Sequence, residues 1–321
     1  MARKRKGKPV SGWINFDKPV GMSSTQAVGK LRWLFGAQKA GHAGTLDPLA
    51  SGVLPIALGE ATKTVPFMMD AAKGYDFTIT WGANTASWDA EGEITATSDI
   101  RPARADIEAV LPQFIGDISQ IPPKYSAIKV GGKRAYALMR GKDAGSVEFE
   151  LTPRPIKVES LILNGCDAHS AQFSLACGKG TYVRSIARDL IAALGTCGHV
   201  TALRRTRVGV FDLSEDGAPA FTLEALEESC HRDGVSQALY PVSTALDDIP
   251  VLAVTEHDAK ELKHGRAITR PQDFKDSASG LTLATSGGIE IALLRADGPT
   301  LVPKRVFNIV VNYGEHDVDY T

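Results

Sequence analysis

Residues 41–63 read Gly-His-Ala-Gly-Thr-Leu-Asp-Pro-Leu-Ala-Ser-Gly-Val-Leu-Pro-Ile-Ala-Leu-Gly-Glu-Ala-Thr-Lys, with Asp47 surrounded by glycines and prolines. Glycine permits backbone conformations closed to other residues, and proline fixes φ. The residue before a proline is also displaced from the helical region. The stretch therefore predicts a shaped loop from which Asp47 projects. An Asp-Pro pair is most often a surface turn, so the pattern alone leaves a turn and a catalytic carboxylate both open.

The composition limits the kind of protein in which this loop acts. The chain has 321 residues, enough for two domains, and a hydrophobic fraction of 43% supports an ordinary core. The net charge is −1, so an RNA-binding surface would have to come from local clusters of the 36 Lys and Arg residues. The four cysteines lack C-x-x-C pairing, and we expect reduced thiols, no metal and no cofactor.

The targeting signals in the sequence are also limited. No apolar run is long enough to cross a bilayer. The basic N-terminus lacks the apolar region of a signal peptide. These observations predict a cytoplasmic protein without a membrane partner.

Three regular elements are expected around the central loop. Residues 12–16 predict a strand that ends in a turn at Lys18, and a helix is expected from Ser23 to Gly36. In residues 73–82, apolar and polar residues alternate as in a half-buried strand. Tyr75 stands at the start of that strand, where it is either a core residue or a platform on which a base stacks.

The second half of the chain contributes basic residues. Between residues 124 and 142, lysines and arginines alternate with aromatic and aliphatic residues, which fits a mobile element that closes over a polyanion or a solvated helix face. Residues 181–184 predict the end of a strand, with Ser185 as the cap of the next helix, so that Arg184 stands at their junction. Arg204 and Arg205 begin a run that is either a charged surface strand or a contact to phosphate and sugar.

The two ends of the chain have different compositions. Residues 1–11 predict a basic, flexible arm that adds phosphate attraction independent of sequence. Residues 241–250 predict a linker. Beyond it, a short helix at residues 258–262 and several alternating strands predict a small β-rich domain.

These motifs together resemble the TruB family of tRNA pseudouridine synthases, which act on the uridine at position 55 in the T loop. The resemblance runs from about residue 12 to residue 307. The central stretch carries it, together with Gln-Ile-Pro-Pro-Lys-Tyr-Ser-Ala, Gly-Thr-Tyr-Val-Arg-Ser-Ile-Ala-Arg-Asp and Leu-Arg-Arg-Thr-Arg-Val-Gly, in this order. One departure is Ala86, where the family usually has an acidic residue, although Asp89 is kept.

The resemblance implies an α+β fold: a mixed, largely antiparallel sheet flanked by helices and loops, in a catalytic domain at residues 12–243. It further implies a PUA-like RNA-binding domain at residues 250–313, and a T-arm clamp at about residues 124–151. The expected partner is tRNA, bound through the T arm and through the acceptor stem at the C-terminal domain. We expect a monomer, with room for a second role in tRNA folding.

The resemblance also assigns roles to individual residues. Asp47 matches the catalytic aspartate, Tyr75 the tyrosine that stacks on the target base, and Arg184 the arginine that pairs with the aspartate. The residues that match positions lining or supporting the site are His42, Lys18, Tyr182 and Leu203. The candidates for RNA contact are Lys124, Lys129, Lys133, Arg134, Arg204 and Arg205.

The chemistry implied is an isomerisation, in which a glycosidic C–N bond breaks and a C–C bond forms. Asp47 should be ionised at neutral pH, and Arg184 would hold it in place. A glycoside hydrolase is an alternative, but such enzymes usually need two carboxylates, and the cleft motif offers one. A non-catalytic RNA-binding or RNA-folding protein is a second alternative, because the basic segments would serve it equally well.

Overall fold

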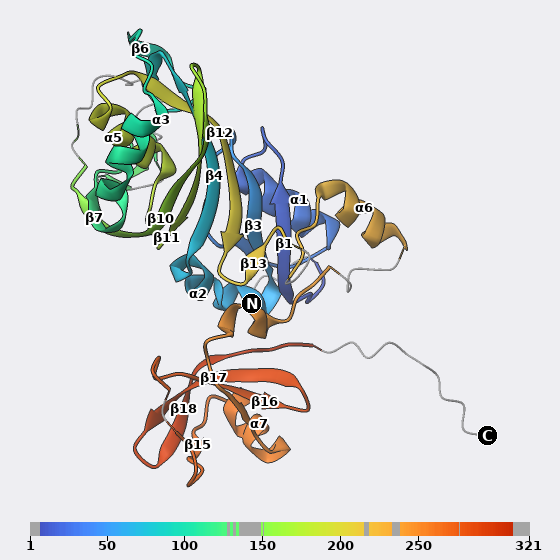
Figure 1. Cartoon of the computed structure of the whole chain (residues 1–321). Helices are drawn as coiled ribbons and strands as arrows, with labels where there is room; N and C mark the ends of the chain where they lie inside the picture. The colour runs from blue at the N-terminus through green and yellow to red at the C-terminus, as the bar shows by residue number, and fades with distance from the viewer. Residues whose placement is uncertain are drawn as a thin grey trace.

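The computed structural model describes residues 7–126, 129–130, 133–134, 149, 151–214, 218–232, 238–275 and 277–310, without the side chains of residues 129–130, 133–134 and 230–232. Figure 1 shows a larger body built on a sheet and a smaller part formed by the C-terminal strands. The strand order of the larger sheet is β1-β3-β12-β4-β11-β10-β7, with β2 on β3 and β13 on β12. Among the strand pairs of this sheet in the described residues, only the β12–β3 pair is parallel, which confirms the expected mixed, largely antiparallel α+β fold.

The strands of the larger sheet have the following bounds: β1 Gly12–Lys18, β2 Ala40–His42, β3 Ser51–Leu58, β4 Lys73–Trp81, β7 Gly116–Gln120, β10 Arg154–Cys166, β11 Ser170–Cys177, β12 Gly198–Val208 and β13 Phe211–Asp212. The predicted strands at residues 12–16 and 73–82 are confirmed as β1 and β4. Along β4, buried and more exposed residues alternate, and Tyr75, Phe77 and Ile79 share the buried face. On β12, Leu203 pairs with Phe77, and Arg205 pairs with Tyr75.

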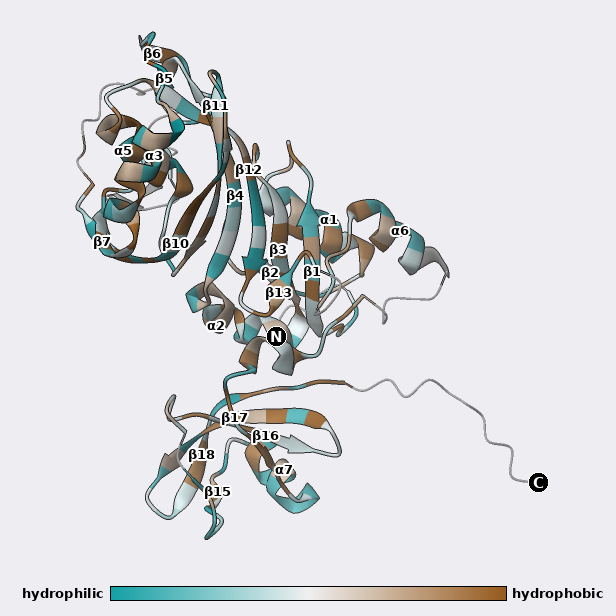
Figure 2. Cartoon of the chain, in the orientation of Figure 1, coloured by the Kyte–Doolittle hydropathy of each residue, from teal (hydrophilic) through white to brown (hydrophobic). Residues whose placement is uncertain are grey.

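Helices cover the buried face of the sheet. The predicted helix after Ser23 is α1, Ser24–Leu34, and Ser23 caps it together with the Gln26 side chain. The remaining helical elements of this body are η1 Gly59–Lys63, α2 Val65–Asp70, α3 Arg104–Val110, η2 Leu111–Phe114, α5 Val183–Ala193 and α6 Leu223–Arg232. Residues of α1, η2 and α5 share a core with the strands. In Figure 2, helix α7 of the smaller part is mainly hydrophilic.

The smaller part is β-rich, as predicted. Its sheet has the order β14-β16-β17-β18-β15, and the predicted helix at residues 258–262 is α7, Glu256–Lys263. Its strands are β14 Val251–Ala253, β15 Ile268–Thr269, β16 Thr282–Ser286, β17 Ile289–Asp297 and β18 Thr300–Val306.

The segment between the two parts differs from the predicted linker. Residues Val242, Ala245 and Leu246 of η3, Val242–Leu246, are buried together with Ile249. They share a core with residues from both parts, including Phe307. The two parts are therefore joined through apolar packing rather than through a solvated linker.

Three further local predictions are wrong. Lys8 pairs with the chain at Gly36 and Gln38, and the Ser11 hydroxyl accepts a hydrogen bond from the Glu60 amide, so Lys8 and Ser11 are not part of a flexible arm. Residues 181–184 are not a strand end, because α5 begins at Val183 with Tyr182 as its N-cap. Ser185 therefore lies inside the helix and does not cap it.

Short hairpins complete the fold. Residues 83–97 contain the hairpin of β5, Ala83–Thr85, and β6, Ile94–Thr97. The strands β8, Lys129–Val130, and β9, Lys133–Arg134, also form a pair. Most of the predicted clamp at residues 124–151 lies outside the described residues.

Candidate active site

A cleft of about 320 Å³ opens where the Asp47 loop faces β4, β12 and the start of α5. It brings together six of the residues predicted from the sequence, which are Asp47, Tyr75, Tyr182, Arg184, Leu203 and Arg205. It also includes Lys73, which was not predicted. These residues come from segments far apart in the sequence, so their convergence is a property of the fold.

Asp47 is held at this cleft by an ion pair with Arg184. Its Oδ2 lies 2.8 Å from Nη2 of Arg184, and the side chain remains 36% exposed. The Arg184 side chain is only 6% exposed, so the partner of the carboxylate is fixed by burial while the carboxylate itself stays accessible. Such a pair holds the carboxylate in a fixed orientation.

Arg184 has a second carboxylate partner that the sequence reasoning did not assign. Nη1 of Arg184 lies 3.3 Å from Oδ2 of Asp89, whose side chain is 5% exposed. Arg184 also donates hydrogen bonds to the carbonyl oxygens of Ser87, at 3.0 Å, and Tyr125, at 2.8 Å. The guanidinium is thus fixed from several sides. The sequence offered one signal for this role, the retained acid at position 89 in a loop that lacks the usual acid at position 86.

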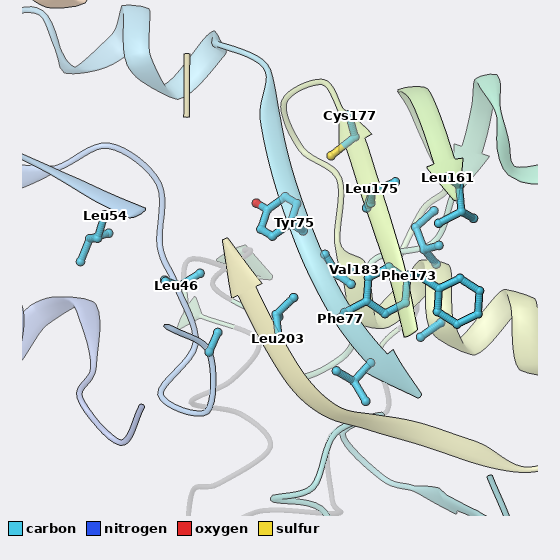
Figure 3. Packing of buried hydrophobic residues seen from close by; sticks show 14 of the residues in the cluster. Leu46, Leu54, Tyr75, Phe77, Leu161, Phe173, Leu175, Cys177, Val183 and Leu203 are labelled. Carbon is cyan, nitrogen blue, oxygen red and sulfur yellow. The ribbon is translucent and has the colours of Figure 1, made fainter. Parts of the chain in front are cut away.

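Tyr75 faces the Asp47 loop from β4. Figure 3 shows its side chain directed toward the loop that carries Leu46, with Leu203 on the neighbouring strand. Burial raises the pKa of Tyr75, and the Arg205 charge opposes that rise. Burial also raises the pKa of Tyr182. Both tyrosines are therefore neutral at physiological pH and present rings to the cleft.

Two lysines at or near the cleft donate hydrogen bonds to backbone carbonyls. Lys18 donates to the carbonyl oxygens of Pro19 and Met22, and Lys73 donates to those of Met69 and Ala71. Burial, followed by repulsion from Arg205, lowers the pKa of each lysine to about 8. Lys18 is fully buried, so it supports the turn and does not itself line the cleft.

The remaining predicted residues are distributed differently. His42 lies partly buried on β2, outside the residues that line the cleft. Arg204 faces away from Arg205 and pairs with Asp17 at 2.7 Å. Arg205 is buried, so the prediction of a surface contact to RNA does not fit its position. Lys124 is exposed, and the side chains of Lys129, Lys133 and Arg134 lie outside the described residues.

Comparison with known proteins identifies the class to which this fold and cleft belong. Residues 32–183 match the N-terminal domain of the TruB family pseudouridylate synthases, and residues 184–247 match the C-terminal domain of tRNA pseudouridylate synthase B. The chain belongs to the TruB family, which confirms the resemblance seen in the sequence. Residues 250–313 lie beyond both matches, so their PUA-like character stays a prediction.

Individual relatives agree with this membership. The chain is 54% identical to tRNA pseudouridine synthase B of Caulobacter sp. (strain K31), over 96% of this chain and 100% of the relative. It is 51% identical to tRNA pseudouridine synthase B of Bradyrhizobium diazoefficiens, over 95% of this chain and 88% of the relative. A solved Cbf5-Nop10-Gar1 complex contains a chain of similar fold, with a TM-score of 0.67, 25% identity, and coverage of 92% of this chain and 84% of that chain. Across the described part of the chain, no helix has the length and apolar character needed to cross a membrane.

Proposed function

We propose that this chain isomerises a uridine of tRNA to pseudouridine in the cleft around Asp47. The observation that supports this function most directly is the accessible Asp47 carboxylate, fixed by the buried Arg184 at 2.8 Å in a cleft that Tyr75 also lines. The reaction breaks the bond between N1 of uracil and C1′ of ribose and joins C5 to C1′. The C5 proton leaves to solvent and N1 gains a proton, so the product has the mass of the substrate.

The uridine must leave its stacked position before it can react. Extrusion costs a few kcal/mol of stacking and pairing energy. Stacking on the Tyr75 ring recovers about 1–3 kcal/mol of this cost. Leu203 lies on the same buried face of the sheet as Tyr75 and provides an apolar wall for the base.

Asp47 opens the reaction by one of three routes. The carboxylate attacks the base, attacks C1′ of the ribose, or removes a proton from the sugar. Each route requires an accessible and oriented carboxylate, and the pairing with Arg184 leaves Asp47 36% exposed while it fixes the position of the carboxylate. Tyr75 has a second proposed role, in which its hydroxyl helps to move the C5 proton of the rotated base.

The substrate assignment rests on family membership. We assign the uridine at position 55 in the T loop as the target, with the T arm as the main contact and the acceptor stem reaching the C-terminal domain. The protein acts as a cytoplasmic monomer in this proposal, and it also assists tRNA folding. Lys124 is the described member of the predicted clamp that is exposed for such a contact.

Asp47→Asn tests the proposal with unmodified tRNA whose uridines carry tritium at C5. Tritium release reports loss of the C5 proton, and filter binding reports tRNA affinity. We expect no tritium release from the variant while tRNA binding persists, because the change removes one exposed charge and little volume. Wild-type turnover by the variant would refute the role of Asp47. Release of free uracil by the wild type would instead indicate a hydrolase, and binding without any reaction would indicate an RNA-binding protein.

A further inference from the structure

Arg205 is a buried cation beneath the loop that carries Asp47. It lies on β12 where this strand pairs with both neighbours, next to Gly52 of β3 on one side and Tyr75 of β4 on the other. Only 1% of the residue is exposed. None of the ion pairs found between described residues includes it. A buried charge without a carboxylate needs another set of acceptors, because leaving it unbonded is costly.

Those acceptors are backbone carbonyls at both ends of the Asp47 loop. Nε of Arg205 donates to the carbonyl of Val53 at 2.7 Å. The two terminal nitrogens donate to the carbonyls of Thr45 at 3.4 Å and Gly44 at 3.2 Å. One side chain therefore joins two residues that precede Asp47 to Val53 of β3, six positions after it. The planar fork of a guanidinium suits this bridging, whereas a lysine ammonium acts from a single point.

The glycine at position 52 makes this close approach possible. Gly52 has a φ of +100°, and a Cβ added there would lie 2.1 Å from the carbonyl oxygen of Arg205. A side chain at this position would clash with the backbone of β12. The Asp47 loop and β12 are thus in contact through their backbones at Gly52 as well as through the Arg205 guanidinium.

The opposite side of the loop is tied to the start of α1. The hydroxyl of Ser24 accepts a hydrogen bond from the Leu46 amide at 2.8 Å and donates to the Leu46 carbonyl at 2.9 Å. The amide of Gly21 donates to the Pro48 carbonyl at 2.7 Å. The backbone around Asp47 is therefore held on two sides, while its side chain remains 36% exposed.

We propose that Arg205 is a positioning residue, which holds both ends of the 44–53 loop so that the Asp47 carboxylate keeps its place opposite Tyr75 when RNA enters the cleft. The proposal rests on the proposed function of this cleft. A direct phosphate contact is disfavoured because the guanidinium is buried and bonded to the loop. The neighbouring Arg204, whose side chain is 41% exposed, faces the other side of the strand.

Arg205→Lys tests this role by separating turnover from binding. The lysine keeps the positive charge but cannot bridge both ends of the loop. We expect the single-turnover rate of tritium release to fall about 10²-fold, the factor that a displacement of about 1 Å can cost. The Kd for tRNA and its dependence on salt should stay as in the wild type. Arg205→Ala should lose more activity, and guanidinium ion, but not an equal concentration of sodium chloride, should restore part of its rate.

Arg104→Lys is the matched control, because Arg104 lies on α3 in an exposed pair with Glu108. Its rate and affinity should equal those of the wild type. A wild-type rate in Arg205→Lys would overturn the proposal. So would weaker tRNA binding with a salt slope reduced by about one, the result expected for a lost phosphate contact. If the Arg205 variants do not fold, Ser24→Ala tests the same loop, and a wild-type rate there would also overturn it. No tritium release by the wild type would instead refute the proposed function itself.

Discussion

Arg184 lies between two carboxylates of different exposure, and this difference predicts different consequences for two similar substitutions. The Asp47 side chain is 36% exposed, whereas the Asp89 side chain is 5% exposed. Asp89 also accepts hydrogen bonds from the Ser87 hydroxyl and the Glu91 amide. Replacing either aspartate with asparagine keeps the volume and removes one charge. Asp47→Asn should therefore affect chemistry, and Asp89→Asn should affect both stability and chemistry.

The magnitudes follow from what Arg184 retains in each variant. In Asp89→Asn, Arg184 still pairs with Asp47. The free energy of unfolding should therefore fall by about 1.5–3 kcal/mol, the contribution of a hydrogen bond to a charged group. This decrease should be smaller than the roughly 3–5 kcal/mol that follows when a buried charge loses its only partner. In Asp47→Asn, Arg184 keeps Asp89 and its two carbonyl acceptors, and the lost carboxylate is itself partly exposed, so the stability should change by about 1 kcal/mol or less. Turnover should vanish in Asp47→Asn and fall about 10–10²-fold in Asp89→Asn, because Arg184 then shifts within the site.

Urea unfolding followed by tryptophan fluorescence measures the stability of both variants, and tritium release at saturating enzyme measures their turnover. Asp70→Asn is a suitable control, because Asp70 pairs with Lys179 in a contact in which both side chains are 64% exposed. Wild-type stability and turnover in Asp89→Asn would refute the reasoning. A larger stability loss in Asp47→Asn than in Asp89→Asn would refute it as well.

Three further predictions concern the base platform, a buried lysine and the junction between the two parts. Tyr75→Phe keeps the ring, so tRNA binding should persist with slower tritium release if the hydroxyl moves a proton, and an unchanged rate would limit Tyr75 to stacking. The pKa of Lys73 is lowered from 10.5 to about 8 by burial, so the unfolded chain binds more protons between these values and stability rises with pH there. Lys73→Met should reduce that rise, measured as the melting temperature from pH 7 to pH 10, and an unchanged rise would contradict the assignment. Phe307 is fully buried in the core shared by both parts. Phe307→Ala should therefore lower the free energy of unfolding by about 3–5 kcal/mol and speed proteolysis between residues 241 and 250. Unchanged unfolding in urea would show that this packing contributes little to stability.

The regular elements of the larger body could be predicted because local pattern and tertiary packing agree there. The alternation along β4 corresponds to a strand with one buried face. The capping sequence at Ser23 begins α1 as expected. The motif around Asp47 identified the family because it combines a carboxylate with a particular set of glycines and prolines.

The start of α5 could not be read from the local sequence. By propensity, a strand is favoured at Thr181, Tyr182 and Val183. Long-range hydrogen bonds nevertheless hold this segment at the start of a helix. The Gln120 side chain accepts a hydrogen bond from the Tyr182 amide and donates one to its carbonyl. The Ser185 hydroxyl donates to the Ile121 carbonyl instead of capping the helix. These partners lie about sixty residues away in the chain, so tertiary structure overrides local preference.

Two misread segments did contain usable signals. In residues 241–250, the buried positions 242, 245, 246 and 249 follow helical spacing, which argues for packing rather than a linker. Arg205 is two positions from Leu203 on the same strand, so both face the side on which Tyr75 lies. Charge alone suggested a surface contact, whereas the period of the strand placed this arginine inside.

The central claim, that Asp47 isomerises a uridine of tRNA, is tested most directly by incubating the protein with an unmodified tRNA transcript and mapping pseudouridine chemically at every uridine. The account predicts one new pseudouridine, in the T loop, formed by the wild type and absent after treatment with Asp47→Asn. Free uracil in place of an isomer, or pseudouridine formed equally by Asp47→Asn, would contradict it.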